Sequence, residues 1–486
     1  MEWLSETNFG KRSPKPLQLW DLSLSFGQTL ISSSPTRLLD FRPPADRFSM
    51  RPNTGSSLDE WTTYIQSIHF RSIDLSLDRP RRVLHRMRLP RPSTVIVVGG
   101  TNGKGTTVRL LETVYRSAGY SVGCYTSPHL VSYTERVRLN DEDVKAAALC
   151  RAFSAVDMAR QEIPLTYFEF GTLAAFKLMA DSNIQVAILE VGMGGRLDAV
   201  NLMSADLAVI TSVELDHQAW LGTTRERIGA EKAGIFRYQS KAVVADPNPP
   251  KSVKERLKQL RCDALISGED YTLKSEPGSG WSWAPSTPRA DDWALKKGTD
   301  LPQSWILGSC SAVRAANLSG ALACLYHLSD RLVVKQKHVN AIFSAALPGR
   351  RERIDGAIPI WLDVAHNPHA VAGLRDELTV EPVTGVTRAV FAMLADKDVE
   401  ACVELLQGVV DEWSLCSLED DRALSIAALE ARMPRGCVVR HSAGVKPWEV
   451  FSEVISNSKP GDRVVAFGSF YLVGDILESL RTGVTS

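Results

Sequence analysis

The stretch TVIVVGGTNGKGTT, residues 94–107, decides the fold. Its first five residues are apolar or β-branched and predict a buried parallel strand. A glycine-rich turn follows, and the helical spacing over residues 107–117 predicts a helix. Glycines allow backbone N–H groups to approach phosphate oxygens, and a helix N-terminus adds partial positive charge. The stretch therefore predicts a loop that binds nucleotide phosphates.

This loop departs from the common pattern, in which a lysine is followed directly by Ser or Thr. Val98 stands where that pattern has its first glycine, and Gly105 separates Lys104 from Thr106. An ordinary glycine-rich turn is the alternative interpretation. Lys104 favours the nucleotide site, because it can bring a full charge to the β- and γ-phosphates. The candidate residues for ATP binding in this loop are Thr101, Asn102, Gly103, Lys104, Gly105 and Thr106.

The strand–loop–helix alternation recurs on both sides of this stretch. Further apolar strands are predicted at residues 186–191 and 207–211, and helices at 58–70 and 313–328. Such alternation predicts an α/β fold with a doubly wound, mostly parallel sheet. A second α/β alternation starts near Ile358 and predicts a smaller, Rossmann-like C-terminal domain. Its predicted strands are residues 360–364, 388–393 and 463–467.

The domain boundaries follow from breaks in these patterns. Leu347-Pro348-Gly349 separates the two alternations, so we expect an ATP-binding domain over 51–346 and a C-terminal domain over 347–486. Residues 265–305 have Gly, Ser, Pro and Trp without clear periodicity and predict an insertion. Residues 1–50 hold loose clusters of Ser, Pro and Arg and predict a disordered extension, unless translation starts at Met50.

The composition narrows the classes of partner. The chain has 486 residues with 56 Lys+Arg and 56 Asp+Glu, and this zero net charge argues against nucleic acid as the main partner. The sequence has no run of about 18 uncharged apolar residues, so it predicts no transmembrane helix. The eight cysteines contain no Cys-x-x-Cys pair, which argues against a zinc site and for reduced thiols. We therefore expect a cytoplasmic protein that binds small molecules.

Polar residues follow several predicted strands, at the edge where ligands bind in open α/β sheets. Glu190 ends an apolar run and suits Mg²⁺, which prefers oxygen ligands; His217 follows the next strand. Taken singly, Glu190 could be a surface acid and His217 a structural histidine. Their joint position after neighbouring strands favours a metal site. Ser127-Pro128-His129 and Glu231-Lys232 follow other strands in the same way.

A series of motifs resembles the folylpolyglutamate synthase/dihydrofolate synthase family of the Mur ligases. The motifs are residues 100–107, 126–130, 135–138, 166–169, 190–201, 231–237, 347–350 and 363–369. The resemblance extends from about residue 58 to the C-terminus, is weak at 265–305 and does not include 1–50. It implies that ATP phosphorylates a carboxylate and that the amine of L-glutamate attacks the acyl phosphate. The product would be an amide.

The resemblance also implies roles for individual residues. Ser127, Glu190 and His217 would be metal ligands in a site for two Mg²⁺ ions. Lys232 would be carbamylated, with a plain salt bridge to an acid as the alternative. The catalytic candidates are Lys104, Lys232 and His366.

Four residues match family positions that hold nucleotide or substrate, one before the domain boundary and three after it. Asn317, Arg350 and Asp363 would bind ATP, and His366 would orient phosphate or glutamate unless it caps a helix. Arg351 stands where the family usually has an apolar residue, so packing at this hinge is expected to differ.

The acceptor is the finer question. Residues 72–79 resemble the dihydropteroate loop of bifunctional members, which implies both dihydrofolate synthesis and polyglutamylation of reduced folates. Polyglutamylation alone, another Mur-type amino-acid ligase and an inactive nucleotide-binding relative are the alternatives. A monomer is expected, because related ligases need no partner. The candidate pterin- or folate-binding residues are Ser72, Ile73, Asp74, Thr166, Tyr167, Phe168, Glu169, Leu197, Asp198 and Ala199.

Overall fold

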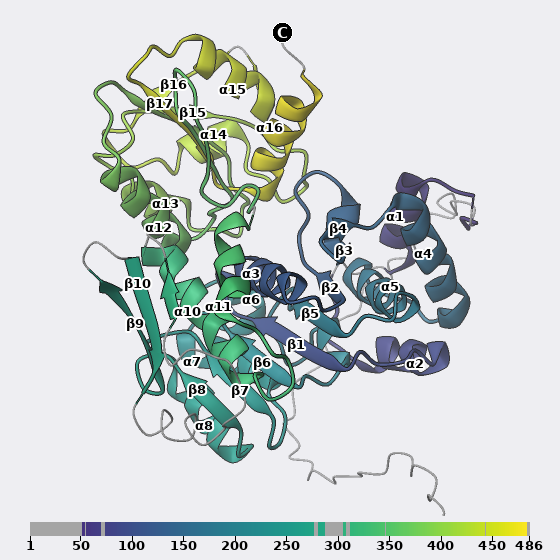
Figure 1. Ribbon diagram of the computed structural model, residues 1–486. Helices are drawn as coiled ribbons and strands as arrows, with labels where there is room; N and C mark the ends of the chain where they lie inside the picture. Colours follow the sequence, from purple (N-terminus) through teal and green to yellow (C-terminus); the bar gives the residue numbers. More distant parts are fainter. Residues whose placement is uncertain are drawn as a thin grey trace, which may run out of the picture. The chain divides into compact units, whose positions relative to one another are not determined.

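The computed structural model describes residues 51–53, 55–69, 73–276, 280–286, 305–307, 312–345, 347–442 and 444–483 (Figure 1). Contacts divide the chain into two units, and the second, Ser49–Ser486, contains all of these residues. The predicted extension 1–50, the candidate Ser72 and part of the predicted insertion 265–305 lie outside the described residues.

The larger sheet has eight strands in the order β4-β3-β2-β5-β1-β6-β7-β8. The strands from β2 to β8 in this order are parallel, and β3 and β4 are antiparallel at one edge. β1 lies in the middle, with Val97 paired with Leu189 of β5 and Ala208 of β6. The strands are β1 (Thr94–Gly99), β2 (Val122–Tyr125), β3 (Val137–Leu139), β4 (Glu142–Asp143), β5 (Val186–Glu190), β6 (Leu207–Ile210), β7 (Lys241–Val244) and β8 (Asp263–Ile266).

Helices cover both faces of this sheet, which is why its central strands are apolar throughout. Val95 and Val97 of β1 face one core, and Ile96 and Val98 face the other. The first core includes residues of α1 (Leu58–Ile68), α2 (Asp78–Met87), α4 (Ala146–Arg160), α5 (Tyr167–Asp181), α6 (Gln218–Leu221), α7 (Arg225–Lys232) and α8 (Lys251–Gln259). The second includes residues of α3 (Lys104–Ser117), α10 (Ala312–His327) and α11 (Gln336–Val339).

A small antiparallel sheet occupies the described part of the region predicted as an insertion. It consists of β9 (Tyr271–Glu276), β10 (Gly280–Pro285) and β11 (Trp305–Leu307). The fully buried Trp283 ring lies 5.6 Å from the rings of both Tyr271 and Tyr326 of α10. Tyr271 Oη donates a hydrogen bond of 3.2 Å to the Val244 carbonyl of β7. This sheet is therefore anchored to the larger one.

The C-terminal part forms a separate six-stranded sheet with its own core. Its order is β12-β13-β17-β14-β15-β16, and only β12 is antiparallel to its neighbour. The strands are β12 (Glu352–Ile354), β13 (Ile360–Asp363), β14 (Thr387–Phe391), β15 (Glu412–Leu415), β16 (Val438–Arg440) and β17 (Arg463–Phe467). The helices are α12 (Pro368–Val380), α13 (Val399–Glu404), α14 (Ile426–Glu430), α15 (Pro447–Ser456) and α16 (Phe470–Thr482). The predicted fold class is confirmed.

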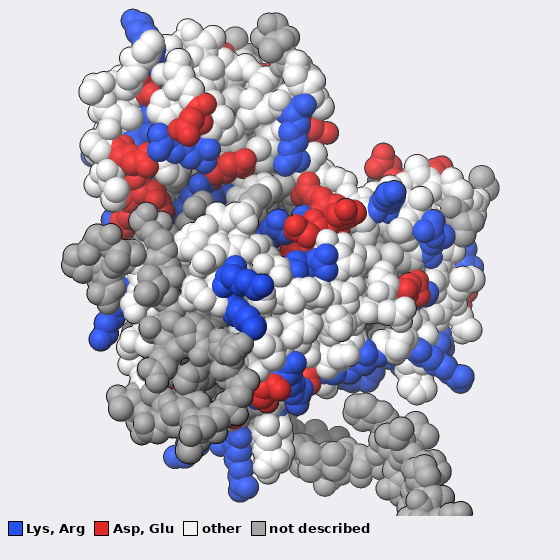
Figure 2. Space-filling view, in the orientation of Figure 1, with Lys and Arg blue, Asp and Glu red and all other residues white. Residues whose placement is uncertain are grey.

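The mixed surface charge agrees with the zero net charge of the chain, and the helices agree with the absence of a long apolar run in the sequence. On the face drawn in Figure 2, basic and acidic side chains are interspersed. In the part of the chain that the structure describes, no helix is long and apolar enough to span a bilayer.

Candidate active site

The carboxyl ends of strands from both parallel sheets line one cavity of about 730 Å³. The loops after β1, β5 and β6 contribute from the larger sheet. Residues 363–366 after β13, Leu394 and Lys397 after β14, and residues 468–471 after β17 contribute from the smaller one. Ligands of open α/β folds bind at this edge, so the cavity is the candidate active site.

The loop between β1 and α3 forms a close-fitting cradle. α3 begins at Lys104, so the amides of Lys104, Gly105 and Thr106 have no carbonyl partner one turn earlier. Gly103 has a φ of 81°, and a Cβ there would collide with the Asn317 side chain of α10. A Cβ at Gly105 would lie 2.7 Å from Arg350 Nη2. The glycines therefore leave room for Asn317 and Arg350, two residues predicted to bind the nucleotide, to approach the loop.

Two lysines, the partly buried Lys104 and the buried Lys232, converge on this loop. Lys104 Nζ donates to the carbonyls of Gly100 and Thr101, at 3.2 and 3.1 Å, and Lys232 Nζ donates to the same Gly100 carbonyl at 2.8 Å. Burial lowers the pKa of both lysines, and the charge of Lys104 contributes to a pKa of about 7 for Lys232. Among the described residues, Lys232 has no carboxylate partner within 4.0 Å, so the alternative of a salt bridge to an acid is not seen there.

The predicted metal ligands line the same cavity. Glu190 is buried and accepts a hydrogen bond from the Ser127 amide at 3.2 Å. Burial raises the pKa of Glu190, while the charges of Lys104 and Arg350 oppose this shift. Burial lowers the pKa of His217 to about 4, which leaves a neutral imidazole that can coordinate a cation.

The donor set fits a divalent cation by its chemistry. The described residues contain no group of three or more His, Cys, Asp or Glu side chains arranged to hold a metal. Ser127, Glu190 and His217 instead offer one hydroxyl, one carboxylate and one imidazole. A cation held by so few protein ligands retains waters or substrate oxygens, as is typical of Mg²⁺ with phosphates.

Asp216 links the two halves of the cavity, and its role was not predicted. It lies between β6 and α6 and forms an ion pair of 2.6 Å with Lys397 of the C-terminal part. Its other oxygen is 3.8 Å from His366 Nε2 and 4.0 Å from His217 Nε2. Burial opposes ionisation, but the neighbouring His366, His217 and Lys397 outweigh it and hold the pKa of Asp216 well below its usual range.

A second link joins the phosphate loop to α12. The side chains of Asn102 and Asn367 exchange hydrogen bonds of 2.9 and 3.1 Å, and Asn102 also contacts His369 Nδ1 at 3.0 Å. Asn367 is also the N-cap of α12, accepting from the Ala370 amide at 3.0 Å. The predicted alternative for His366, helix capping, therefore belongs to Asn367.

The remaining predicted nucleotide and catalytic residues of the C-terminal part also line the cavity. Asp363 is buried and accepts from the Ala365 amide at 3.0 Å; burial raises the pKa of Asp363 to about 6. His366 Nδ1 bonds to the Val364 carbonyl at 2.8 Å, which leaves Nε2 without that proton. Arg351, the departure at the hinge, forms an ion pair of 3.2 Å with Glu377.

The predicted pterin residues form a contrasting group, because none of those described lines the cavity. Thr166 and Glu169 form the capping box of α5. Arg79 forms ion pairs with Glu169 and Asp74, at 2.8 and 2.9 Å. Asp198 accepts hydrogen bonds from the amides of Met193 and Val200 and caps a short 3-10 helix. Ile73, Leu197 and Ala199 lie outside the cavity lining as well.

Two aromatic residues of this group support the cavity wall from behind. The Phe168 ring packs against Gly192, where a Cβ would come within 2.6 Å of it. The Tyr167 ring lies 5.5 Å from the Arg136 guanidinium. Gly192 and Arg136 both line the cavity, so Tyr167 and Phe168 lie one layer behind its surface.

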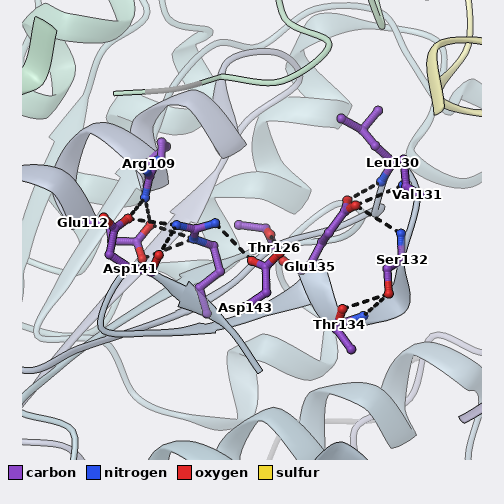
Figure 3. A network of polar contacts seen from close by, with 11 residues as sticks. Arg109, Glu112, Thr126, Leu130, Val131, Ser132, Thr134, Glu135, Asp141 and Asp143 are labelled. Atoms are coloured by element: carbon purple, nitrogen blue, oxygen red, sulfur yellow. Dashed lines mark hydrogen bonds and ion pairs between the residues drawn. The ribbon is translucent and has the colours of Figure 1, made fainter. Parts of the chain in front are cut away.

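The motif at residues 135–138 fixes the wall that carries Ser127 (Figure 3). Glu135 accepts hydrogen bonds from the amides of Leu130, Val131 and Ser132, at 2.7, 3.1 and 3.1 Å. Leu130 itself packs against the core of the C-terminal sheet. The loop that carries Ser127 is thus bonded to Glu135 on one side and packed against the C-terminal core on the other.

A buried acid ties the phosphate-loop helix to the edge of the larger sheet. Glu112 of α3 is fully buried and accepts from Arg109 at 2.9 Å and from Arg138 of β3 at 3.2 Å (Figure 3). Arg138 also reaches Asp143 at 3.0 Å. The position of α3, and of the loop at its start, therefore depends on this network.

Comparison with known proteins agrees with the geometry. The Mur ligase middle domain matches residues 98–274, and the glutamate ligase domain of Mur ligases matches residues 349–470. The dihydrofolate synthase/folylpolyglutamate synthase of Escherichia coli (strain K12) is 37% identical over 429 residues, which span 88% of this chain and 96% of that protein.

Solved structures show the same likeness. E. coli FolC in complex with DHPP and ADP superimposes with a TM-score of 0.81 at 34% identity, covering 90% of this chain and 100% of that one. A bifunctional folylpolyglutamate synthase/dihydrofolate synthase with Mn, AMPPNP and L-glutamate bound gives a TM-score of 0.77 at 34% identity, covering 88% and 99%. The resemblance seen in the sequence is confirmed, and the chain belongs to the dihydrofolate synthase/folylpolyglutamate synthase family of the Mur ligases.

Proposed function

We propose that this chain is an ATP-dependent ligase that joins L-glutamate to dihydropteroate and adds further glutamates to reduced folates. The observation that carries the proposal is one cavity in which a phosphate loop, two lysines and strand ends from both sheets meet. The structures of relatives with DHPP and ADP, and with AMPPNP and L-glutamate, support the same substrates.

The phosphate loop and its neighbours would hold the nucleotide. The free amides at the start of α3 would bind phosphate oxygens, and Lys104 and Arg350 would neutralise the charge that develops on the transferred phosphoryl group. Lys104 now donates to two loop carbonyls, which are weaker partners than phosphate. Asn317 and Asp363 complete the nucleotide side of the cavity.

Ser127, Glu190 and His217 would hold Mg²⁺, which supplies charge neutralisation on the phosphates. The Mn-containing relative supports a divalent ion at such a site. The neutral His217 and the Lys104 charge near Glu190 both favour ligation by these groups at neutral pH.

We also propose that Lys232 is carbamylated. A carbamate forms when a neutral amine attacks carbon dioxide and releases a proton to solvent, and the pKa of about 7 leaves much of Lys232 neutral at physiological pH. Lys232 Nζ donates to the Gly100 carbonyl and has no carboxylate partner among the described residues, so no ion pair favours its protonated form. The resulting anion would be stabilised by Lys104, and it would offer oxygens to a second Mg²⁺ ion.

His366 would orient the incoming glutamate and accept a proton from its attacking amine. Its Nδ1 is occupied by the Val364 carbonyl, so Nε2 is the atom that can take the proton. Asp216, 3.8 Å from Nε2, would stabilise the imidazolium that forms. The acyl phosphate would collapse to the amide with release of phosphate.

The acceptor would lie beside the wall that Tyr167 and Phe168 support, and the other predicted pterin residues would shape this wall rather than contact the pterin. We propose a monomer, because related ligases need no partner. A cytoplasmic location is proposed as well, since the cysteines that the structure describes are all free thiols.

The test is ADP release by the purified protein with Mg²⁺-ATP and L-glutamate, with dihydropteroate and tetrahydrofolate as separate acceptors. Turnover with both supports the bifunctional proposal. Turnover with tetrahydrofolate alone reduces the function to polyglutamylation, and no turnover with either refutes the proposal.

A further inference from the structure

Arg422 lines the cavity and has no role in the nucleotide or metal site described above. It belongs to the segment between β15 and α14. Its side chain is 61% exposed, whereas Lys232 is buried. Arg422 can therefore contact a part of a bound substrate that reaches the solvent-exposed part of the cavity lining.

The guanidinium of Arg422 is held in a fixed orientation. Nε and Nη2 donate to the two carboxylate oxygens of Asp420, at 2.9 and 3.1 Å, and Nη2 also donates to Tyr471 Oη at 3.3 Å. The backbone carbonyl of Arg422 accepts from the Ala395 amide at 2.8 Å, beside the segment that carries Lys397. These bonds reduce the entropy that the side chain would lose when it binds a ligand.

One nitrogen of this guanidinium remains available. Nη1 has no hydrogen-bond partner among the residues that the structure describes. Arginine donates to carboxylates with a geometry that few other side chains match, so a carboxylate is the natural ligand. Tyr471, which Arg422 contacts, also lines the cavity, so both residues can face the same ligand.

The two acceptors differ in the group that would reach this position. The only carboxylate of dihydropteroate is the one that reacts, so it must lie at the phosphate loop. A reduced folate has an additional α-carboxylate, and each glutamate added leaves another behind the reacting end. Of the two acceptors, only the glutamylated one therefore carries a carboxylate that is free to pair with a cavity-lining cation such as Arg422.

We propose that Arg422 binds the α-carboxylate of glutamylated folates and so selects the acceptor of the polyglutamylation reaction, without contributing to dihydrofolate synthesis. This inference rests on the proposed function. It assigns to one residue the difference between two activities that share the same ATP, metal and glutamate sites.

The experiment compares Arg422→Ala and Arg422→Lys with a matched control, Arg440→Ala. Arg440 lies in the same sheet domain, is 62% exposed and pairs with Glu412 at 2.7 Å, but it does not line the cavity. KM and kcat are measured for dihydropteroate, for tetrahydrofolate with one, two and three glutamates, and for L-glutamate.

Arg422→Ala is expected to raise KM for the tetrahydrofolates about tenfold, with kcat and the KM for dihydropteroate and L-glutamate within about twofold of the parent. Arg422→Lys is expected to recover part of the loss, and Arg440→Ala to change nothing. Binding of tetrahydrofolate without ATP, followed by fluorescence, gives a second readout that does not depend on turnover.

Equal losses with both acceptors, together with a raised KM for L-glutamate, would place Arg422 at the incoming amino acid and overturn the inference. Unchanged tetrahydrofolate KM and binding would overturn it too. If Arg422→Ala fails to fold, Arg422→Gln gives the same comparison with the side-chain bulk retained. A parent protein without activity on either acceptor would instead refute the proposed function, and tetrahydrofolate binding would then still test Arg422.

Discussion

The nucleotide side and the pterin side of the site were predicted from motifs of similar length, but their residues lie in different positions relative to the cavity. Every residue predicted for ATP, metal or catalysis lines the cavity. Each described residue of the pterin set lies behind it or outside it, and Thr166, Glu169 and Asp198 are engaged as helix caps. A family motif thus contains both residues that contact ligand and residues that shape the backbone, and the sequence alone does not separate them.

The largest effect is expected at the nucleotide side. Lys104→Ala should lower kcat by about a thousandfold or more, because it removes the charge aimed at the transferred phosphoryl group. The melting temperature should not fall, since desolvation disfavours the charged form of the partly buried Lys104. Lys177→Ala is the control, as Lys177 pairs with Asp181 on the surface of α5. Substantial turnover in the variant would contradict the assignment.

The pH dependence tests Lys232. Its pKa is lowered to about 7, so the amine is neutral above that pH and protonated below it. Activity after equilibration should therefore fall as the pH drops through about 7, because only the neutral amine forms a carbamate. Added bicarbonate should restore part of the activity, because it is a source of carbon dioxide. ¹³C NMR with labelled bicarbonate would show the carbamate directly. Its absence above pH 8, or its persistence in Lys232→Arg, would count against the modification.

The link between the sheets should have an intermediate effect. Asp216→Asn removes the charge that faces Lys397 and His366, so kcat/KM should fall about tenfold to a hundredfold for both acceptors. The ratio of the two activities should stay constant, because both use the same glutamate and phosphate groups. A selective loss with one acceptor would show that Asp216 contacts that acceptor instead.

The smallest effect is expected at the pterin side. Thr166→Ala removes the N-cap of α5, which should cost about 1 kcal/mol of unfolding free energy. Thermal denaturation should show this loss, and both activities should change little and by the same factor. A rise in KM confined to dihydropteroate would show that Thr166 contacts the pterin, and the contrast between the two sides would then disappear.

Regular elements were predictable where the local pattern determined them. β17 spans the predicted residues 463–467, and the predicted strand 388–393 appears as Thr387–Phe391. α3 starts three residues before the predicted helix, at Lys104, because the turn at Gly103 takes a positive φ and the following glycine then fits the helix beside Arg350. In a sequence, glycine usually indicates a loop, but Gly105 lies within α3 because its close contact with Arg350 leaves no room for a side chain.

Pairings between distant segments were not predictable. Asp216 and Lys397 lie 181 residues apart, and Asn102 and Asn367 lie 265 apart. Nothing in the spacing of either pair indicates that two separate sheets bring them together. The sequence showed Asp216 as a polar residue after β6, but only its neighbour His217 had a predicted role, as a metal ligand. Lys232 shows the same limit, since its low pKa comes from burial beside Lys104 rather than from its own motif.

The short loop from Ser127 to Ser132 belongs to both halves of the molecule at once. Ser127 lines the cavity, Leu130 packs against the core of the C-terminal sheet, and Glu135 holds the amides between them. Because this loop contacts both the cavity and the C-terminal core, we expect ligand binding beside Ser127 to affect the packing of Leu130 on that core. If the ligand binds two arrangements of the sheets with different affinity, it shifts the equilibrium between them by the same free energy.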